Sequence, residues 1–69
     1  MPFVNIRIVK EVLEDAEQQK AQISQRVTDA ISEVVGIPKE AIWVVFEDIT
    51  DTDWYVGATS VQEMRKESQ

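Results

Sequence analysis

The residue with the clearest chemical potential is Pro2, which stands directly behind Met1 and directly ahead of an apolar segment. Removal of Met1 would make its nitrogen a free secondary amine, a base that no internal proline offers. A free α-amino group titrates near about 7.7–8, and burial or nearby cations lower that pKa because both disfavour the ammonium form. Such an amine is suited to abstracting a proton next to a carbonyl. From position alone, the alternative is a proline that merely begins a strand.

The composition narrows the remaining chemistry. The chain has no His and no Cys, so a disulfide or a Cys/His zinc site is excluded, and no metal or cofactor is expected. Seven basic and 13 acidic residues give a net charge of −6, which disfavours nucleic acids and anionic membranes as partners. No apolar run approaches the roughly 20 residues that span a bilayer, and no signal-peptide pattern is present. The cytoplasm is the default compartment.

A strand and a long helix are predicted in the first half of the chain. Residues 3–9 alternate, with one set on one face (Val4, Ile6, Ile8) and the other opposite (Phe3, Asn5, Arg7, Val9). Asp15 is the predicted N-cap of a helix over residues 16–35, with Gln18 in capping-box spacing, and Gly36 is its stop. The apolar stripe of that helix is predicted at Ile23, Val27, Ala30, Ile31 and Val34.

A second strand is predicted at residues 42–46, a continuous apolar run that suggests cover on both faces. Strand, helix and strand in this order predict a right-handed βαβ unit with parallel strands. Two strands are too few for independent stability, and one helix covers only one sheet face. The predicted fold class is therefore α+β: a small βαβ protomer that oligomerisation completes into a larger sheet.

Less regular structure is expected downstream. Residues 47–53 are interpreted as a solvated acidic loop, and 54–58 as a short extended segment or turn. Ser60 and Glu63 have capping-box spacing, which predicts a short helix over residues 61–66. The last residues are expected to fray.

Four segments together carry a family resemblance: M-P-F-V-N-I-R-I, E-Q-Q-K, I-P-K-E-A-I-W-V-V-F-E-D and W-Y-V-G. Over residues 2–58 the chain resembles the 4-oxalocrotonate tautomerase family. The resemblance implies a single tautomerase-like domain over residues 1–69. It also implies that Pro2 shuttles a proton between carbons of a small dienol or 2-oxo acid, and that βαβ protomers assemble as hexamers, built from dimers, with pockets made by several subunits.

The sequence departs from this family at the arginines that bind substrate carboxylates. Residues 11–14, in the loop after the first strand, contain no arginine, and Trp43 occupies the slot of the second-strand arginine. A Trp cannot replace a bidentate guanidinium at a carboxylate. Arg7 and Lys10 are the nearest cations to Pro2 in sequence and are the predicted substrate ligands, with salt bridges as the alternative. Lys39 is a further candidate.

Trp54 matches the family's aromatic residue at the apolar pocket wall and completes the predicted substrate-binding set. An aromatic there would exclude water and help to keep the Pro2 amine neutral. The alternative is a core or interface aromatic, and Trp43 is left open between the same choices. Tyr55 is a weaker candidate, as a hydrogen-bond donor to a developing enolate.

Two other functions compete with tautomerisation. The acidic residues Glu47, Asp48, Asp51 and Asp53 lack the spacing of a calcium loop, but one of them could activate water for hydration or dehalogenation of an unsaturated acid. The second competing function is that of a non-catalytic subunit in a hetero-oligomer, in which a partner subunit supplies the missing arginines. The predicted function remains a tautomerase that acts through Pro2.

Overall fold

The computed structural model describes residues 1–67. Two strands, β1 (Phe3–Val9) and β2 (Trp43–Ile49), are joined through the long helix α1 (Ala16–Val35), with short 3-10 turns η1 (Lys10–Val12) and η2 (Lys39–Ala41) in the connections. A small hairpin, β3 (Tyr55–Val56) with β4 (Thr59–Ser60), and the helix α2 (Val61–Glu67) follow. The fraying predicted for the last residues concerns 68 and 69, which lie outside the described part.

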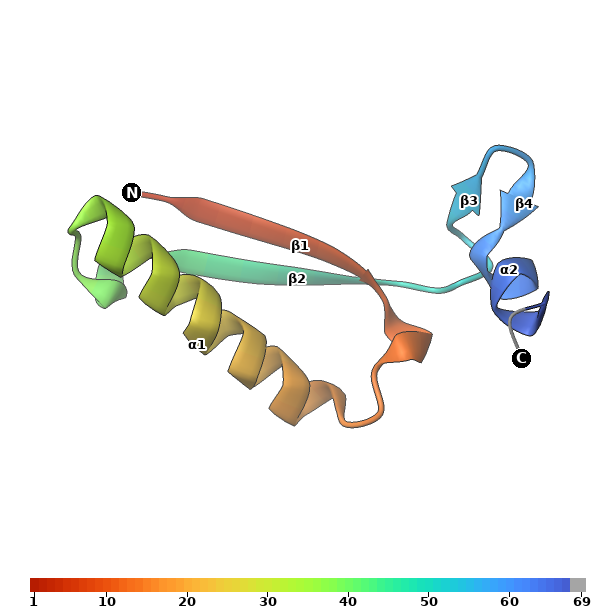
Figure 1. Cartoon of the computed structure of the whole chain (residues 1–69), viewed down its shortest axis with the longest axis horizontal. Helices are drawn as coiled ribbons and strands as arrows, with labels where there is room; N and C mark the ends of the chain where they lie inside the picture. Colours follow the sequence, from red (N-terminus) through yellow and green to blue (C-terminus); the bar gives the residue numbers. More distant parts are fainter. Residues whose placement is uncertain (68–69) are drawn as a thin grey trace.

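The central sheet confirms the βαβ prediction. β1 and β2 pair in parallel, from Phe3 opposite Trp43 to Val9 opposite Ile49, and α1 runs along the sheet (Figure 1). On β2, Val44 and Phe46 are half-buried, and the Nζ of Lys20 in α1 lies 5.9 Å from the centre of the Phe46 ring. These residues therefore belong to the face that α1 covers.

The opposite sheet face is uncovered. Phe3 is 62% exposed, Trp43 57% and Val45 39%, although all three stand in the sheet. The predicted bounds 42–46 were wrong at both ends, because Ile42 precedes the strand and Glu47 to Ile49 continue it. The continuous apolar run also alternates in exposure, since a single protomer covers only one of its two faces.

The two ends of α1 are capped almost as predicted. The Asp15 carboxylate accepts a hydrogen bond from the backbone N–H of Gln18 at 3.5 Å. The reciprocal bond comes from Gln19, whose Oε1 accepts from the Asp15 N–H at 3.1 Å, so the predicted partner Gln18 was wrong by one position. At the other end Gly36 adopts φ 79°, a left-handed conformation that glycine tolerates, and its N–H donates to the Ser32 carbonyl.

The apolar stripe of α1 is narrower than predicted. Ile23, Val27 and Ile31 are half-buried, spaced by four residues along one line of the helix. Ala30 and Val34 are exposed, Val34 by 84%, so both were wrongly placed in the buried stripe. A sheet of two strands covers only a narrow band of the helix, which leaves the flanking positions outside the contact.

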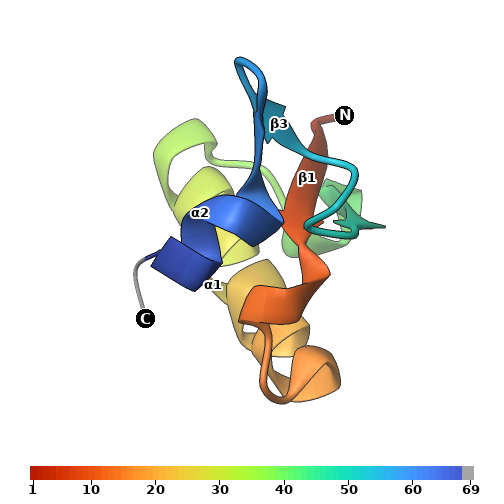
Figure 2. The same ribbon diagram turned by 90° about the vertical axis from the view of Figure 1, so that its right-hand side faces the viewer.

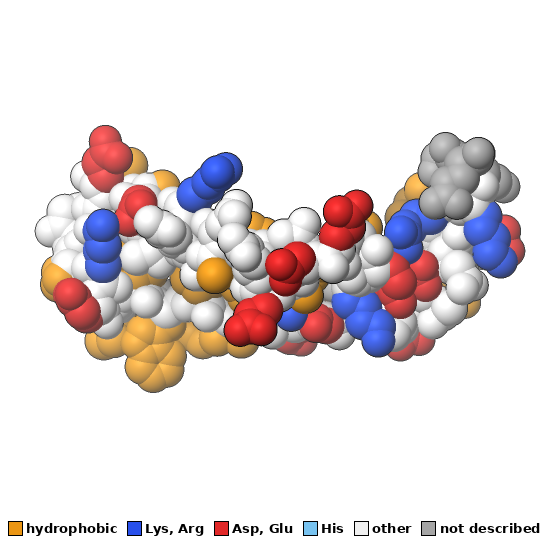
Figure 3. Space-filling model, turned by 90° about the horizontal axis from the view of Figure 1, so that it is seen from below, with side chains coloured by type: hydrophobic (Ala, Val, Ile, Leu, Met, Phe, Trp, Pro, Cys, Tyr) orange, Lys and Arg blue, Asp and Glu red, His pale blue; other side chains and the backbone are white. Residues whose placement is uncertain are grey.

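The protomer is elongated and has almost no closed core. It measures 43 × 25 × 16 Å with a radius of gyration of 15.0 Å, against about 11 Å expected for a compact domain of this length. Ile42, at 9% exposed, is the one buried apolar residue among those described. Seen from below, hydrophobic side chains gather at the left-hand end, which carries the amino terminus in Figure 1 (Figure 3). Much of the apolar surface of the described chain therefore lies outside a closed core.

The hairpin and α2 form a separate lobe at the end of the molecule opposite the amino terminus (Figure 1). Gly57 turns the hairpin with φ 64°, and the Ser60 hydroxyl accepts from the backbone N–H of Glu63 at 3.2 Å. This N-cap confirms the predicted start of the last helix, which runs to residue 67. Viewed along the long axis, α2 lies in front of the sheet and the hairpin projects beyond it (Figure 2).

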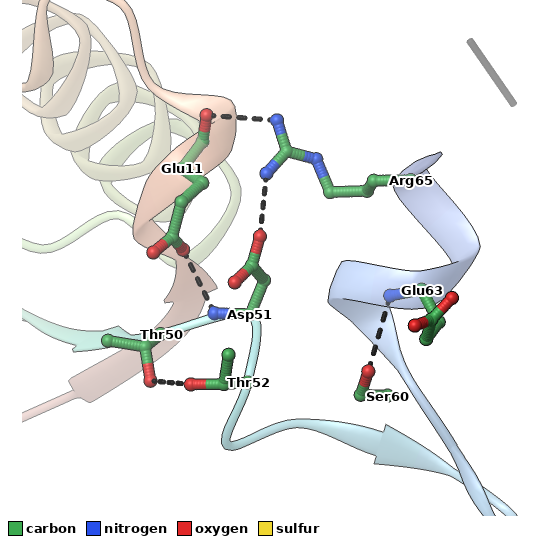
Figure 4. A network of polar contacts seen from close by, with 7 residues as sticks. All are labelled: Glu11, Thr50, Asp51, Thr52, Ser60, Glu63 and Arg65. Carbon is green, nitrogen blue, oxygen red and sulfur yellow. Dashed lines mark hydrogen bonds and ion pairs between the residues drawn. The ribbon is translucent and has the colours of Figure 1, made fainter. Parts of the chain in front are cut away.

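An ion-pair network joins this lobe to the β1–α1 connection (Figure 4). Arg65 donates to the Asp51 carboxylate at 3.0 Å and to the carbonyl oxygen of Glu11 at 3.2 Å. The Glu11 carboxylate in turn accepts from the backbone N–H of Asp51 at 2.9 Å. Asp51 is 7% exposed, so its interpretation as part of a solvated loop was wrong: Arg65, 14 positions later, compensates its burial.

Replacing Asp51 with alanine should destabilise the protein. Asp51→Ala removes the carboxylate that Arg65 binds, and we expect a loss of about 1–3 kcal/mol in the free energy of unfolding. Urea titration at a fixed protein concentration measures it. Asp48→Ala is the matched control: Asp48 pairs with Lys20 at 2.8 Å but is 41% exposed, and we expect a cost below about 1 kcal/mol. Equal costs for the two variants would contradict this assignment.

Candidate active site

Pro2 stands at the head of β1, half-buried at the elongated molecule's apolar end. Its carbonyl accepts a hydrogen bond from the backbone N–H of Trp43 at 3.1 Å, which fixes it against the start of β2. A hollow of about 250 Å³ lies there, lined by Met1, Pro2, Phe3 and Trp43. With Met1 attached, the Pro2 nitrogen is part of a peptide bond and is not basic. Loss of Met1, which is 85% exposed, would leave an amine at this hollow.

Arg7 lies on the uncovered face of the sheet. Its Nε is 3.7 Å from the Glu47 carboxylate, which also accepts from the Asn5 side chain at 2.8 Å. Arg7 is exposed and lines a second hollow of about 230 Å³ together with Ile49, Asp53, Trp54 and Tyr55. The structure therefore brings together two of the predicted substrate ligands, Arg7 and Trp54.

Within one chain, these two ligands are far from the predicted base. Arg7 is five positions beyond Pro2 on an extended strand, a distance of about 17 Å. The hairpin that follows Trp54 lies at the opposite end of the molecule from the amino terminus (Figure 1). Within a single protomer, Pro2 and the hollow that Arg7 and Trp54 line are therefore too far apart to form one site.

The two lysine candidates also lie apart from Pro2 or are already paired. Lys10 is exposed in η1, beyond the far end of β1 from Pro2. Lys39 lies in η2, and its Nζ is 2.9 Å from the Asp29 carboxylate. The hydrogen bond and the negative charge of Asp29 raise the pKa of Lys39 above its usual 10.5. Lys39 is therefore cationic at neutral pH and held by α1.

This pairing predicts a change in the titration of Lys39. In the Asp29→Asn variant we expect the Lys39 pKa to fall back toward its ordinary value, because the amide keeps the shape of the carboxylate but not its charge. Because the native pKa is raised, the pairing contributes stability below the unfolded-state pKa and loses it as the pH rises through the folded-state value. NMR titration of the lysine side chains measures the shift. An unchanged Lys39 pKa would show that Asp29 does not hold it.

Trp43, which the sequence matched to the slot of the family's second-strand arginine without settling its role, lines the hollow at Pro2. The parallel register sets it opposite Phe3, and both side chains are exposed beside Pro2. The predicted strand starts, residues 3 and 42, would have paired Phe3 with Ile42. The error of one residue at the start of β2 therefore hid the position of Trp43 beside Pro2.

Other kinds of site find no support in the described part of the chain. Among residues 1–67, no three His, Cys, Asp or Glu side chains gather as metal ligands would. None of the described helices is long and apolar enough to cross a membrane. Three of the four acidic side chains considered for water activation are engaged: Glu47 with Asn5, Asp48 with Lys20 and Asp51 with Arg65.

The chain is a small βαβ protein: a two-stranded parallel sheet, one long crossover helix and a proline at the head of the first strand. Known proteins share this arrangement. The model of the family described as "Tautomerase enzyme" matches residues 2–64. A Listeria innocua protein named "Probable tautomerase" is 42% identical over 57 residues, covering 83% of this chain and 88% of that one.

Solved structures give the same result. The crystal structure of TomN, a 4-oxalocrotonate tautomerase homologue in the tomaymycin biosynthetic pathway, superposes with a TM-score of 0.85 at 28% identity, covering 99% of this chain and all of TomN. DmpI from Helicobacter pylori superposes with a TM-score of 0.84 at 29% identity, covering 94% of this chain and 97% of that one. The chain belongs to the tautomerase family and is an enzyme similar to 4-oxalocrotonate tautomerase.

Proposed function

We propose that this enzyme interconverts the keto and enol forms of a small 2-oxo or 2-hydroxydienoic acid, with Pro2 as the general base after removal of Met1. The observation that carries the proposal is the position of Pro2. It is held by the backbone of Trp43 at an open hollow whose lining residues are all apolar. An apolar surrounding favours the neutral amine over the ammonium form, which keeps the base active near neutral pH.

Ketonisation needs only one group that accepts a proton from the enol and returns it to carbon. The Pro2 nitrogen takes the hydroxyl proton of the enol, and the carbon–oxygen bond becomes a carbonyl. The electron pair of the carbon–carbon double bond then forms a bond to a proton that the prolinium returns at the neighbouring carbon. A dienol accepts the proton at the far end of the conjugated system instead, which gives the 1,5 rather than the 1,3 product.

We place the complete site between protomers of a homo-oligomer, with a hexamer built from dimers as the proposed assembly. One chain keeps Pro2 about 17 Å from Arg7 and has almost no closed core. Its 5236 Å² of accessible surface exceeds the roughly 4,400 Å² of a compact monomer of this mass. A second chain would bury this excess and bring a second set of side chains to each Pro2.

The substrate carboxylate is assigned to Arg7 or Lys10 of a neighbouring protomer, and the pocket wall to Trp54. The Glu47 carboxylate is 3.7 Å from the Arg7 Nε, so the guanidinium keeps further N–H groups for an anion. Trp54 lines the same hollow and would exclude water beside a bound carboxylate. The assignments of Arg7 and Trp54 rest on the hollow that they share, and Lys10, which does not line it, is the alternative cation.

Ultraviolet-monitored ketonisation of phenylenolpyruvate and 2-hydroxymuconate tests the activity, with protein whose mass shows that Met1 is absent. Turnover of either enol supports the proposal. Addition of water to an unsaturated acid without enol turnover would contradict it and favour a hydratase. The absence of both activities, with a second small protein co-purifying at equal stoichiometry, would favour a hetero-oligomer subunit.

A further inference from the structure

The hollow at Pro2 has a composition that bears on the choice of substrate. Its lining residues are Met1, Pro2, Phe3 and Trp43, and none of them carries a side-chain charge. Once Met1 is removed, the two aromatic side chains remain beside the amine. They lie on neighbouring strands as direct register partners, so their rings occupy the same sheet face.

The charged groups of the same chain do not compensate for this apolar surface. Arg7 shares the sheet face with Phe3, but it is four positions further along β1, about 13 Å away, and is near the Glu47 carboxylate. Lys39 is on the connection into β2, where its Nζ is bound to Asp29 at 2.9 Å. A substrate carboxylate against Trp43 would therefore lose water without gaining a cation from its own hollow.

An aryl or branched alkyl group of a substrate, unlike a carboxylate, would be stabilised by contact with Trp43. In a single chain Phe3 and Trp43 are 62% and 57% exposed, and a flat apolar group in the hollow would cover the ring surface that a neighbouring protomer leaves open. The hollow measures about 250 Å³ with Met1 as one of its walls, and removal of Met1 would open it further to a ring of this kind. Its chemistry thus fits the uncharged end of a substrate.

We infer that Phe3 and Trp43 form an apolar subsite beside Pro2 that selects enols of 3-aryl or 3-alkyl 2-oxo monoacids over dicarboxylic dienols, with Trp43 as the specificity-determining residue. The inference rests on the proposed function, since it names the substrate class of the Pro2 site. The single carboxylate of such a substrate lies at the end of the molecule away from Trp43. The reaction itself remains the proton transfer described above.

Exchange of Trp43 for a cation tests the inference through a ratio of activities. For the unchanged protein we expect a higher kcat/KM with phenylenolpyruvate than with 2-hydroxymuconate. In Trp43→Arg we expect that ratio to fall by about 10- to 100-fold, because the ring loses its apolar partner and the second carboxylate gains a guanidinium. Gln25→Arg, which adds the same charge on an exposed position of α1, should leave the ratio unchanged.

A binding measurement covers the case in which Trp43→Arg does not fold. The chain has two tryptophans, so Trp54→Phe leaves Trp43 as the sole indole. We expect 3-phenylpropanoate to quench its fluorescence at concentrations at which succinate has no effect. Equal quenching by both acids, or an unchanged activity ratio in folded Trp43→Arg, would overturn the inference. Loss of turnover in Pro2→Ala would still support the proposed function, so the two failures are distinguishable.

Discussion

We expect Pro2→Ala to lower kcat/KM for enol ketonisation by about 10²- to 10⁴-fold, the range that a positioned general base contributes. Alanine at this position still permits removal of Met1, so the variant carries a free amine that can itself accept a proton. That amine is primary rather than secondary and lacks the pyrrolidine ring, and the activity that remains should come from it. Steady-state kinetics with mass-verified protein measure the loss.

The second proline provides the matched control. Pro38 is exposed and precedes η2, and the structure gives it no contact with either hollow. Pro38→Ala should keep activity within a few-fold of the unchanged protein. If Pro2→Ala retained full activity, or if both variants lost the same amount, Pro2 would not be the base.

Val45→Asp should dissociate the proposed assembly and remove most of the activity. Val45 is 39% exposed at the middle of the uncovered sheet face, opposite Asn5. If another chain covers this face, an unpaired carboxylate there costs several kcal/mol on burial, enough to shift the association equilibrium by orders of magnitude. Analytical ultracentrifugation should show a mass near six chains for the unchanged protein and a smaller species for the variant.

A control variant shows whether an added acid elsewhere on the surface also dissociates the assembly. Gln25→Asp places the same acid on an exposed position of α1 and should leave the mass unchanged. Activity should fall in parallel with the loss of the large species, because the proposed site needs more than one chain. An unchanged mass in Val45→Asp would show that the uncovered face is not an interface.

Local chemistry made the long helix predictable. The N-cap at Asp15 and the left-handed glycine at Gly36 act within a few residues, and the observed bounds of α1 agree with the predicted 16–35. The end of β2 was missed because Glu47 and Asp48 look like the start of a loop. They remain in the strand because they pair with Arg7 and Ile8 of β1, and their carboxylates bind Asn5 and Lys20 at 2.8 Å each; all of these partners are distant in sequence.

The pairing of Asp51 with Arg65 was also missed because the two residues are distant in sequence. An acidic residue among other acidic residues is ordinarily solvated, and no spacing rule connects it to a cation in a later helix. Its burial depends on how α2 packs against the β1–α1 connection, which is tertiary information (Figure 4).

The candidate site divides in a similar way. Pro2 was identified from its position and from the family resemblance, and the structure shows the apolar hollow around it. That Arg7 and Trp54 share a second hollow depends on where the chain returns after β2, so the sequence offered them only as separate candidates. Trp43 acquires its place from the strand register alone.

One comparison tests the catalytic role of Pro2 most directly, because it removes Met1 and frees the Pro2 nitrogen while every other residue stays the same. Protein that retains Met1, as shown by mass, is assayed with phenylenolpyruvate before and during trimming by methionine aminopeptidase. The proposed role of Pro2 predicts almost no turnover at the start and a rate that rises in proportion to the trimmed fraction. Full activity with Met1 still attached would show that the amine of Pro2 is not the base.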